Sequence, residues 1–318
     1  MEDSRRGRPA RAWRWVAVAL AAAGVAGTAL AAGVPPAGAV AARSRGAVVR
    51  VVAAENFWGS IASQLGGAHV HVVSIITNPN TDPHSYEPTA ADARTLADAQ
   101  LVIENGIGYD PWVPKLLSAD GGSPTVLNVG DVVGVSDGDN PHRWYNPADV
   151  QTVTQAIVTD LQRIDRGDAA YFQARRVAFD TVSLRAYDAA IAAIRAKYAG
   201  VPVGASESIF AMMAPALRLD LITPPTFLRA ISEGTDVSAA DKETIDAQIK
   251  GHEIKIYVYN SQNVTPDVQA QLGEVKRAHI PYATITETLS PASATFQAWQ
   301  TRELLGIEAA LARATAGP

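Results

Sequence analysis

The order in which strand-like and helix-like segments follow one another along the chain limits its fold most strongly. The dense β-branched run AVVRVVAAE, at residues 47–55, is typical of a buried strand in a parallel sheet. A helix-like stretch follows at 58–66, and the apolar run VHVVSII comes next, at 70–76. Strand and helix at this spacing predict an α/β fold built on parallel sheets.

The alternation continues through two halves of the chain. The first half is completed by a helix at 89–99, the strand LVIEN, the runs DPWVPKLL and TVLNV, and a helix at 147–164. The second half has strands in VPVGAS, KIYVYN and YATIT, with helices at 208–217, 238–250, 266–278 and 293–311. The halves share this architecture without a residue-level repeat, so we expect two α/β lobes, at 47–165 and 200–318.

One long helix is predicted between the lobes, over residues 166–199. The segment between Gly167 and Gly200 contains no glycine or proline. Its second half has an apolar stripe at steps of three and four residues, formed by Leu184, Tyr187, Ile191, Ile194 and Tyr198. At the rise of an α-helix the segment is about 50 Å long. We expect a rigid connection that limits how far the lobes can swing.

The first 42 residues form a separate unit with the layout of an export signal. Five arginines precede an uncharged Ala/Val/Leu-rich run at 16–34, and small residues after this run offer A-x-A cleavage sites. The run has about the length needed to cross a bilayer, so an uncleaved N-terminal membrane anchor is the alternative. Either interpretation predicts an exported protein that works outside the cytoplasm, free or anchored by that helix.

Charge and cysteine content narrow the classes of partner. The formal net charge is −5, and it becomes −8 without residues 1–39, which carry five arginines and two acids. An acidic surface repels nucleic acid and favours cations, so we expect no nucleic-acid partner. The chain has no cysteine. A metal site would therefore be built from nitrogen and oxygen ligands.

Four ligand-type side chains are predicted to lie where strands end, which is where open parallel sheets bind ligands. His84 lies in the proline-bounded loop DPHSYEPT, and His142 lies in a second such loop, DNPHRWYNP. Glu207 directly follows VPVGAS, and Glu287 directly follows YATIT. Two neutral imidazoles and two carboxylates balance the charge of a divalent cation, and both ligand types suit first-row metals.

Each candidate also has a purely structural interpretation. A single loop histidine is more often a hydrogen-bonding surface residue than a ligand, and a glutamate near a helix start favours the positive end of the helix dipole. The occurrence of four such residues, two from each lobe, is what favours a metal cleft. His69 and His71 flank an apolar run with no carboxylate near them in the sequence, so we expect structural roles for both.

Six sequence runs carry a family resemblance that extends from about residue 51 to residue 311. They are AAENFWGSIASQLGG, DPHSYEPT, ADAQLVIENGIGYDPWV, NPHRWYNP, IYVYNSQ and ITETLSP. Together they resemble the substrate-binding proteins of zinc and manganese ABC transporters. The resemblance implies two α/β lobes joined by one rigid helix, with the metal in the cleft. It also implies His84, His142, Glu207 and Glu287 as ligands, the residues already selected by position and chemistry.

Three departures from the family pattern bear on the cargo and on attachment. Asn140 stands where an acid is common, which would weaken a hydrogen bond to a ligating histidine. The lipid-modified cysteine of Gram-positive members is missing, so attachment depends on the N-terminal segment, or the protein is free. The histidine-rich loop of many zinc members is also missing, since residues 117–140 contain no histidine.

The sequence leaves two candidates for the metal, Zn²⁺ and Mn²⁺. Two carboxylates among four ligands and the missing histidine-rich loop favour a harder ion such as Mn²⁺. Most nitrogen and oxygen sites nevertheless bind Zn²⁺ more tightly than Mn²⁺, and four ligands suit tetrahedral zinc. We expect zinc to be the ion bound in vitro, and either metal to be the cargo in the cell.

The predicted function is capture of the metal without catalysis. The two lobes close on the ion, and the closed form, a monomer, docks on an ABC permease in the cytoplasmic membrane. One alternative is a metal-dependent hydrolase, which is disfavoured because no HExxH motif occurs and no candidate is left to act as a general base. A surface metal chaperone or adhesin without a transporter is the other alternative.

Overall fold

The computed structural model describes residues 48–79, 81, 83–120 and 122–316. These residues belong to one compact unit. The predicted export signal or membrane anchor at 1–42 lies outside them. Within the described ranges, no helix combines the length and the apolar character needed to span a bilayer.

The first sheet has four parallel strands in the order β2-β1-β3-β4. They are β1 (Val49–Glu55), β2 (Val70–Ile76), β3 (Leu101–Glu104) and β4 (Thr125–Asn128). Every residue of β1 except Arg50 is buried, as expected for a strand covered on both faces. Alternate β1 residues enter different cores: Val51 and Ala53 join the larger core, and Val52 and Ala54 the smaller one.

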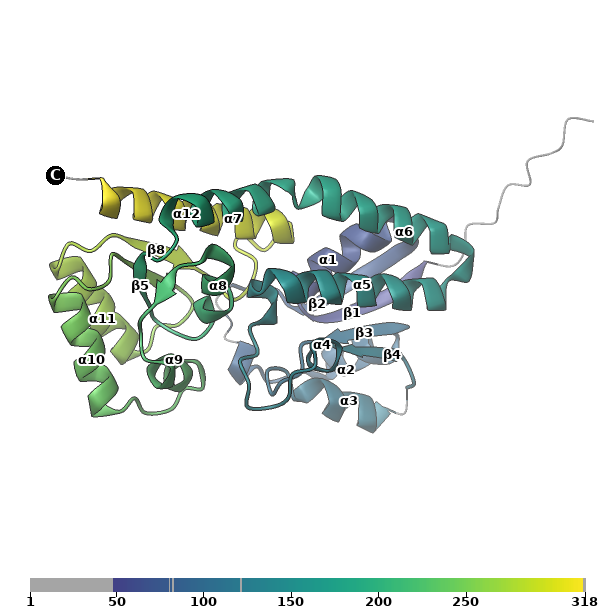
Figure 1. Ribbon diagram of the computed structural model, residues 1–318. Coiled ribbons are helices and arrows are strands. Elements are labelled where there is room, and N and C mark those ends of the chain that lie inside the picture. The colour runs from purple at the N-terminus through teal and green to yellow at the C-terminus, as the bar shows by residue number, and fades with distance from the viewer. Residues whose placement is uncertain (1–47, 80, 82, 121, 317–318) are drawn as a thin grey trace, which may run out of the picture. The chain divides into compact units, whose positions relative to one another are not determined.

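Helices cover both faces of this sheet (Figure 1). One face packs against α1 (Asn56–Gly66), which also contacts α5 (Pro147–Ile164) and α6 (Ala169–Ala178). The smaller core, on the other face, includes side chains from α2 (Ala90–Ala97) and α3 (Trp112–Asp120). The short helix α4 (Val129–Val133) follows β4. The helix predicted at 147–164 is confirmed with those bounds.

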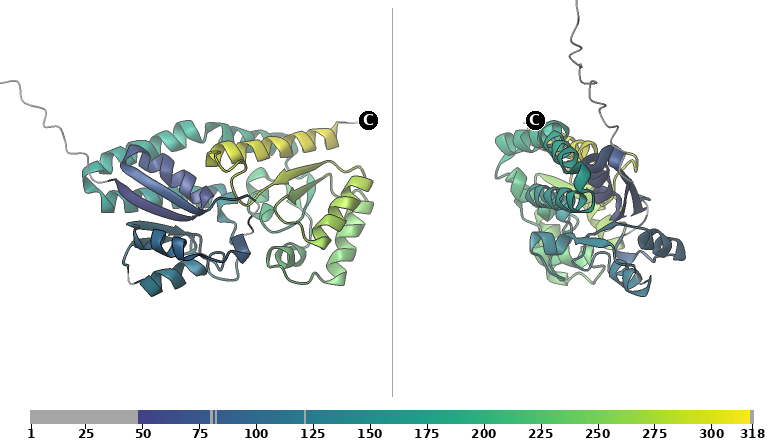
Figure 2. Two further views of the ribbon diagram at one scale, coloured as in Figure 1. Left: turned by 180° about the vertical axis from the view of Figure 1, so that it is seen from behind. Right: turned by 90° about the vertical axis from the view of Figure 1, so that its right-hand side faces the viewer.

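The second sheet repeats the design in the order β6-β5-β7-β8, again with all strands parallel. Its strands are β5 (Pro202–Ala205), β6 (Asp220–Leu221), β7 (Ile256–Asn260) and β8 (Tyr282–Ile285). Its helices are α8 (Ala214–Leu217), α9 (Pro225–Ser232), α10 (Ala239–Lys250) and α11 (Pro266–Arg277). The predicted pair of parallel-sheet α/β lobes is confirmed, and Figure 2 shows both sheets from behind.

One predicted helix of the second lobe is wrong. The segment 208–217 forms a 3₁₀ turn at Phe210–Met212 and then only the four residues of α8. Pro215 explains the break, because it has no N–H to donate and its ring clashes with the carbonyl four residues earlier, so it is tolerated only in a first helical turn. The sequence analysis also missed α9, which begins at Pro225.

The lobes are linked by helix, as predicted, but the link is not α-helical throughout. Between α6 and α7 (Arg185–Tyr198), residues Phe179–Ser183 form a π-helical segment. The backbone N–H of Leu184 donates to the carbonyl of Phe179, five residues earlier, at 3.0 Å. Both side chains are buried. A regular α-helix would put residues five apart on different faces, so the wider turn keeps both in the core.

The last helix, α12 (Phe296–Thr315), connects the two lobes a second time. It packs against α7 and β8, and its N-terminal part also contacts α1 of the first lobe. The backbone N–H of Phe296 donates to Ser60 Oγ on α1 at 2.9 Å. Two helical segments, α6–α7 and α12, therefore hold the two sheets together. The carboxyl ends of the strands in both sheets point toward the region between the lobes (Figures 1 and 2).

Candidate metal centre

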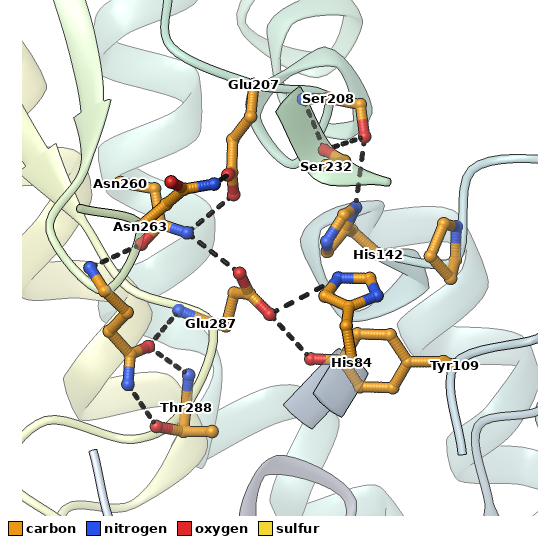
Figure 3. Close-up of polar contacts among 12 residues, drawn as sticks. His84, Tyr109, His142, Glu207, Ser208, Ser232, Asn260, Asn263, Glu287 and Thr288 are labelled. Carbon is orange, nitrogen blue, oxygen red and sulfur yellow. Dashed lines mark hydrogen bonds and ion pairs between the residues drawn. The ribbon is translucent and has the colours of Figure 1, made fainter. Parts of the chain in front are cut away.

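All four predicted ligand residues lie beyond the ends of strands. His84 lies in the 3₁₀ turn Pro83–Ser85, after β2, and His142 immediately precedes the turn Arg143–Tyr145. Glu207 follows β5 by two residues, and Glu287 follows β8 by two residues. Figure 3 shows the four side chains in one region, contributed by both lobes.

Three of the four form a compact group. His84, His142 and Glu287 each offer a ligand atom, and these three atoms lie within 4.8 Å of one another. His84 Nε2 is 3.7 Å from Glu287 Oε2, and the two imidazole ring centroids are 5.6 Å apart. Two imidazoles and a carboxylate at this spacing are a suitable donor set for a first-row divalent metal.

The hydrogen bonds around Asn140 determine the tautomer of His142. Asn140 Oδ1 accepts from the backbone N–H of His142 at 3.1 Å, and Asn140 Nδ2 donates to the carbonyl of Ser208 at 2.7 Å. The atom 2.8 Å from His142 Nδ1 is therefore the amide oxygen, so Nδ1 must be the protonated nitrogen. The lone pair of the imidazole is then on Nε2, which is available to a metal.

His142 is fully buried, and burial has two consequences. Its Nε2 has no hydrogen-bond partner among the described residues, which is costly for a buried polar atom, and a bound metal would supply the missing partner. Burial, and secondarily the charge of His84, lowers the pKa of His142 well below its ordinary value. The ring is therefore neutral at physiological pH, the form in which histidine binds metals.

Two neighbours hold the carboxylate of Glu287, and a third holds its backbone. Tyr109 Oη donates to its Oε2 at 2.9 Å, and Asn260 Nδ2 donates to its Oε1 at 2.9 Å. Gln262 Oε1 accepts from the backbone N–H of Glu287 at 2.5 Å. Glu287 is buried, and these contacts orient its side chain without a bound ion (Figure 3).

Glu207 lies beside this group but is not part of it. Its Oε1 accepts from Asn260 Nδ2 at 2.6 Å, and its Oε2 accepts from Asn263 Nδ2 at 2.8 Å. The residue is buried. Glu207, the fourth predicted ligand, is thus bound to two asparagines of its own lobe. The side-chain amide of Asn260 lies between Glu207 and Glu287 and donates to both.

The sequence analysis missed Asn260 and Tyr109. Asn260 is the last residue of β7, so the rule that selected residues after strands pointed to this edge, but only ionisable side chains were considered. Tyr109 belongs to the run NGIGYDPW and packs its ring on His84, with centroids 4.6 Å apart. Both residues act on the candidate ligands through hydrogen bonds.

Open space reaches the group from two sides through cavities that meet at His84. One cavity, of about 550 Å³, is lined by His84, Glu207 and Glu287 among other residues. A second, of about 380 Å³, is lined by His84, Asn140 and Ser208 among others. His84 therefore borders both cavities and Glu287 borders the larger one, whereas His142 is fully buried. An ion could reach His84 and Glu287 from the larger cavity.

The fold, two parallel-sheet α/β lobes, is shared with solved periplasmic metal binding proteins. A model of the family described as zinc-uptake complex component A, periplasmic, matches residues 51–310. The chain belongs to this family.

Individual relatives are distant in sequence. The chain is 25% identical over 136 residues to the manganese-binding lipoprotein MntA of Halalkalibacterium halodurans, covering 41% of this chain and 45% of that protein. It is 23% identical over 224 residues to the zinc-binding protein TroA of Treponema pallidum, covering 66% of this chain and 70% of that protein. The chain spans less than half the length of most curated relatives that it matches.

Solved structures show the same fold. A Mn-bound periplasmic metal binding protein from Candidatus Liberibacter asiaticus aligns with a TM-score of 0.68 and 18% identity, covering 83% of this chain and 99% of that one. A structure of ZnuA aligns with a TM-score of 0.66 and 19% identity, covering 85% of this chain and 100% of that one. At these identities the likeness establishes the architecture alone.

Proposed function

We propose that this protein captures a divalent transition metal, Zn²⁺ or Mn²⁺, outside the cytoplasm and delivers it to the permease of an ABC transporter. The observation that carries the proposal is the unpartnered Nε2 of the buried, neutral His142, beside His84 and Glu287. Membership of the periplasmic zinc-uptake family supports it. The export signal predicted at residues 1–42 supports action outside the cytoplasm.

The direct ligands in this proposal are His84, His142 and Glu287, with Glu207 as the fourth. Glu207 would reach the ion by exchanging its bond to Asn263 for a bond to the metal while it keeps Asn260. Two imidazoles and two carboxylates would leave the bound ion neutral. The lobes then close on the ion, and the closed monomer docks on the permease.

Two arguments about the metal oppose each other. The carboxylates favour Mn²⁺, and the manganese-binding relative MntA supports that ion. The order of divalent affinities favours Zn²⁺ over Mn²⁺ at any site of nitrogen and oxygen ligands, and the zinc-binding relative TroA supports zinc. We propose that zinc binds more tightly in vitro and that the cell's metal supply decides the cargo.

The proposal is one of binding without catalysis. A hydrolytic metal site needs an open coordination position and a nearby general base. In the proposed site all four ionisable residues are ligands, and Tyr109 and Asn260 serve to hold the two carboxylates. A surface chaperone or adhesin would use the same site, so the transport role depends on the permease.

A competitive titration tests the ligand assignment. Metal-free protein would be titrated with Zn²⁺ and with Mn²⁺ against a chelator of known affinity, alongside His84→Ala and Glu287→Ala. We expect one tight equivalent that both substitutions abolish, and His252→Ala serves as a matched control because it removes a histidine outside the group. Tight binding that persists in both variants would refute the assignment. Metal-dependent binding to permease-containing vesicles tests the transport role separately.

A further inference from the structure

A second group of metal-ligating side chains lies at the opposite end of the first lobe. His69, Asp165 and Asp168 each offer one ligand atom, and these atoms lie within 4.8 Å of one another. His69 immediately precedes β2, and the proposed cleft site lies beyond the other end of that strand. Seven residues of strand span about 20 Å, so the two groups are separate.

The folded chain brings a carboxylate to His69 that the sequence did not reveal. A structural role was expected for this histidine because no carboxylate is near it in the sequence. In the structure its Nδ1 lies 2.5 Å from Asp168 Oδ2, although 99 residues separate the two in the chain. The link between α5 and α6, residues 165–168, brings both aspartates to this histidine.

The side chain of Asp168 does not cap α6 but contacts His69. It occupies the N-cap position of α6, where an aspartate usually accepts from the first free N–H groups of the helix. Its side chain makes no such bond and turns to His69 instead. Asp165 Oδ1 accepts from the backbone N–H of Gly167 at 3.1 Å, which fixes the second carboxylate in the same link.

The two segments that carry the group are tied to each other. Tyr171 on α6 packs its ring on His69, with centroids 4.2 Å apart, and its hydroxyl accepts from the backbone N–H of Ala68 at 3.4 Å. Arg175 donates twice to the carbonyl of Gln64, at 2.8 and 2.5 Å. These contacts position His69 against the aspartates, and an ion that binds the group would displace the proton between His69 Nδ1 and Asp168 Oδ2 into solvent.

We propose that His69, Asp165 and Asp168 form a second divalent-cation site. One imidazole and two carboxylates neutralise a doubly charged ion and suit first-row metals such as Zn²⁺, Co²⁺ and Ni²⁺. Three ligands leave further coordination positions for water. His69 and Asp168 are 27% and 22% exposed, so an ion can enter directly from solvent, and it binds more weakly than in a buried cleft. The proposal does not depend on the function of the cleft.

The experiment counts zinc equivalents by isothermal titration calorimetry with metal-free protein and Zn²⁺ alone. The background is His142→Ala combined with Glu287→Gln, which removes two proposed cleft ligands. We expect one weaker equivalent to remain there, and we expect His69→Ala or Asp168→Asn to abolish it. His71→Ala is the matched control, because it removes an exposed histidine two residues away that is outside both groups.

The calorimetric outcomes distinguish a failure of the second site from a failure of the proposed cleft ligands. If the background variant still binds zinc tightly, the cleft assignment fails, yet His69→Ala must still remove one equivalent. If the background shows no residual zinc binding, or if His69→Ala and Asp168→Asn leave the residual binding unchanged, the second site is refuted. Thermal unfolding of each variant without metal checks that the fold is intact, as expected for partly exposed residues.

Discussion

Glu207 and Glu287 share one hydrogen-bond donor, the side-chain nitrogen of Asn260, at 2.6 and 2.9 Å. The two carboxylates follow different strands, and all three residues are buried. One amide group therefore orients both carboxylates from the second lobe, and the proposed function predicts that its loss weakens metal binding.

Replacing Asn260 with alanine should weaken zinc binding by about 10- to 100-fold, the range found when groups that orient metal ligands are lost. The substitution removes one hydrogen bond from each carboxylate at once. Competition with a chelator at neutral pH measures the change. Asn263→Ala is the matched control, because its side-chain amide donates to Glu207, which by the proposal leaves Asn263 for the metal, so the affinity should be equal or higher. Equal affinities in the wild type and in Asn260→Ala would exclude a positioning role.

Replacing Tyr109 with phenylalanine tests its hydrogen bond to Glu287. The ring that packs on His84 is kept, and the bond from the hydroxyl to Glu287 Oε2 is lost. We expect zinc affinity to fall by about tenfold, since the carboxylate is held less firmly toward the histidines. Calorimetry measures the dissociation constant, and thermal unfolding of the metal-free variant checks that the fold is intact. An unchanged constant would mean that the Tyr109 hydroxyl does not position Glu287 for the metal.

Substitutions of Asn140 distinguish its two bonds. Asn140→Ala removes both the acceptor for His142 Nδ1 and the donor to Ser208, and we expect about 10- to 100-fold weaker zinc binding. Asn140→Asp keeps an acceptor for His142, and its charge makes the imidazole a stronger ligand. We expect Asn140→Asp to bind zinc at least as tightly as the wild type. Weakening in both variants would show that the bond between the lobes matters more than the orientation of His142.

The sequence predicted the parts of the site that obey a local rule. His84 and His142 were found because they lie in proline-bounded loops after apolar strands, and Glu287 because it directly follows a strand. Asn260 obeys the same rule but carries no charge, so a search for ionisable ligands passed over it. The position of Glu207 against Asn263 depends on which hydrogen bonds form in the folded second lobe, and no local pattern encodes that choice.

The features that the sequence did not predict arise from tertiary packing. The π segment at Phe179–Ser183 places Phe179 and Leu184 on one face, and the need for it appears only when both are in the core. The contact between His69 and Asp168 depends on how the α5–α6 link packs beside α1. Sequence proximity is a poor guide to such contacts, which is why the carboxylates near His69 were missed.

Glu55→Gln should change how stability depends on pH. Burial and the neighbouring Asp110 raise the pKa of Glu55 well above its ordinary value, and burial raises the pKa of Asp110 to about 7. The folded state therefore holds protons that the unfolded state releases above about pH 4.5. The stability contributed by this pair is fully present below that pH and is lost as the pH rises through 7.

Glutamine at this position carries no titrating proton, so Glu55→Gln should lose less stability than the wild type between pH 5 and 8. Urea unfolding of metal-free protein across this range measures the difference. The lowered pKa of His142 acts in the opposite direction in both proteins, so the comparison cancels it. Parallel stability curves for the two proteins would contradict the assignment.

Zinc affinity should fall as the pH is lowered from 7.5 to 5, because protons compete with the metal for the imidazoles. Burial lowers the pKa of His142, so this residue stays neutral below the ordinary histidine range, and its share of the loss comes at the acid end. Competition titrations at half-unit steps of pH would trace the profile. An affinity that stays constant down to pH 5 would contradict the ligand role of His84, because only the buried His142 is expected to resist protonation over this range.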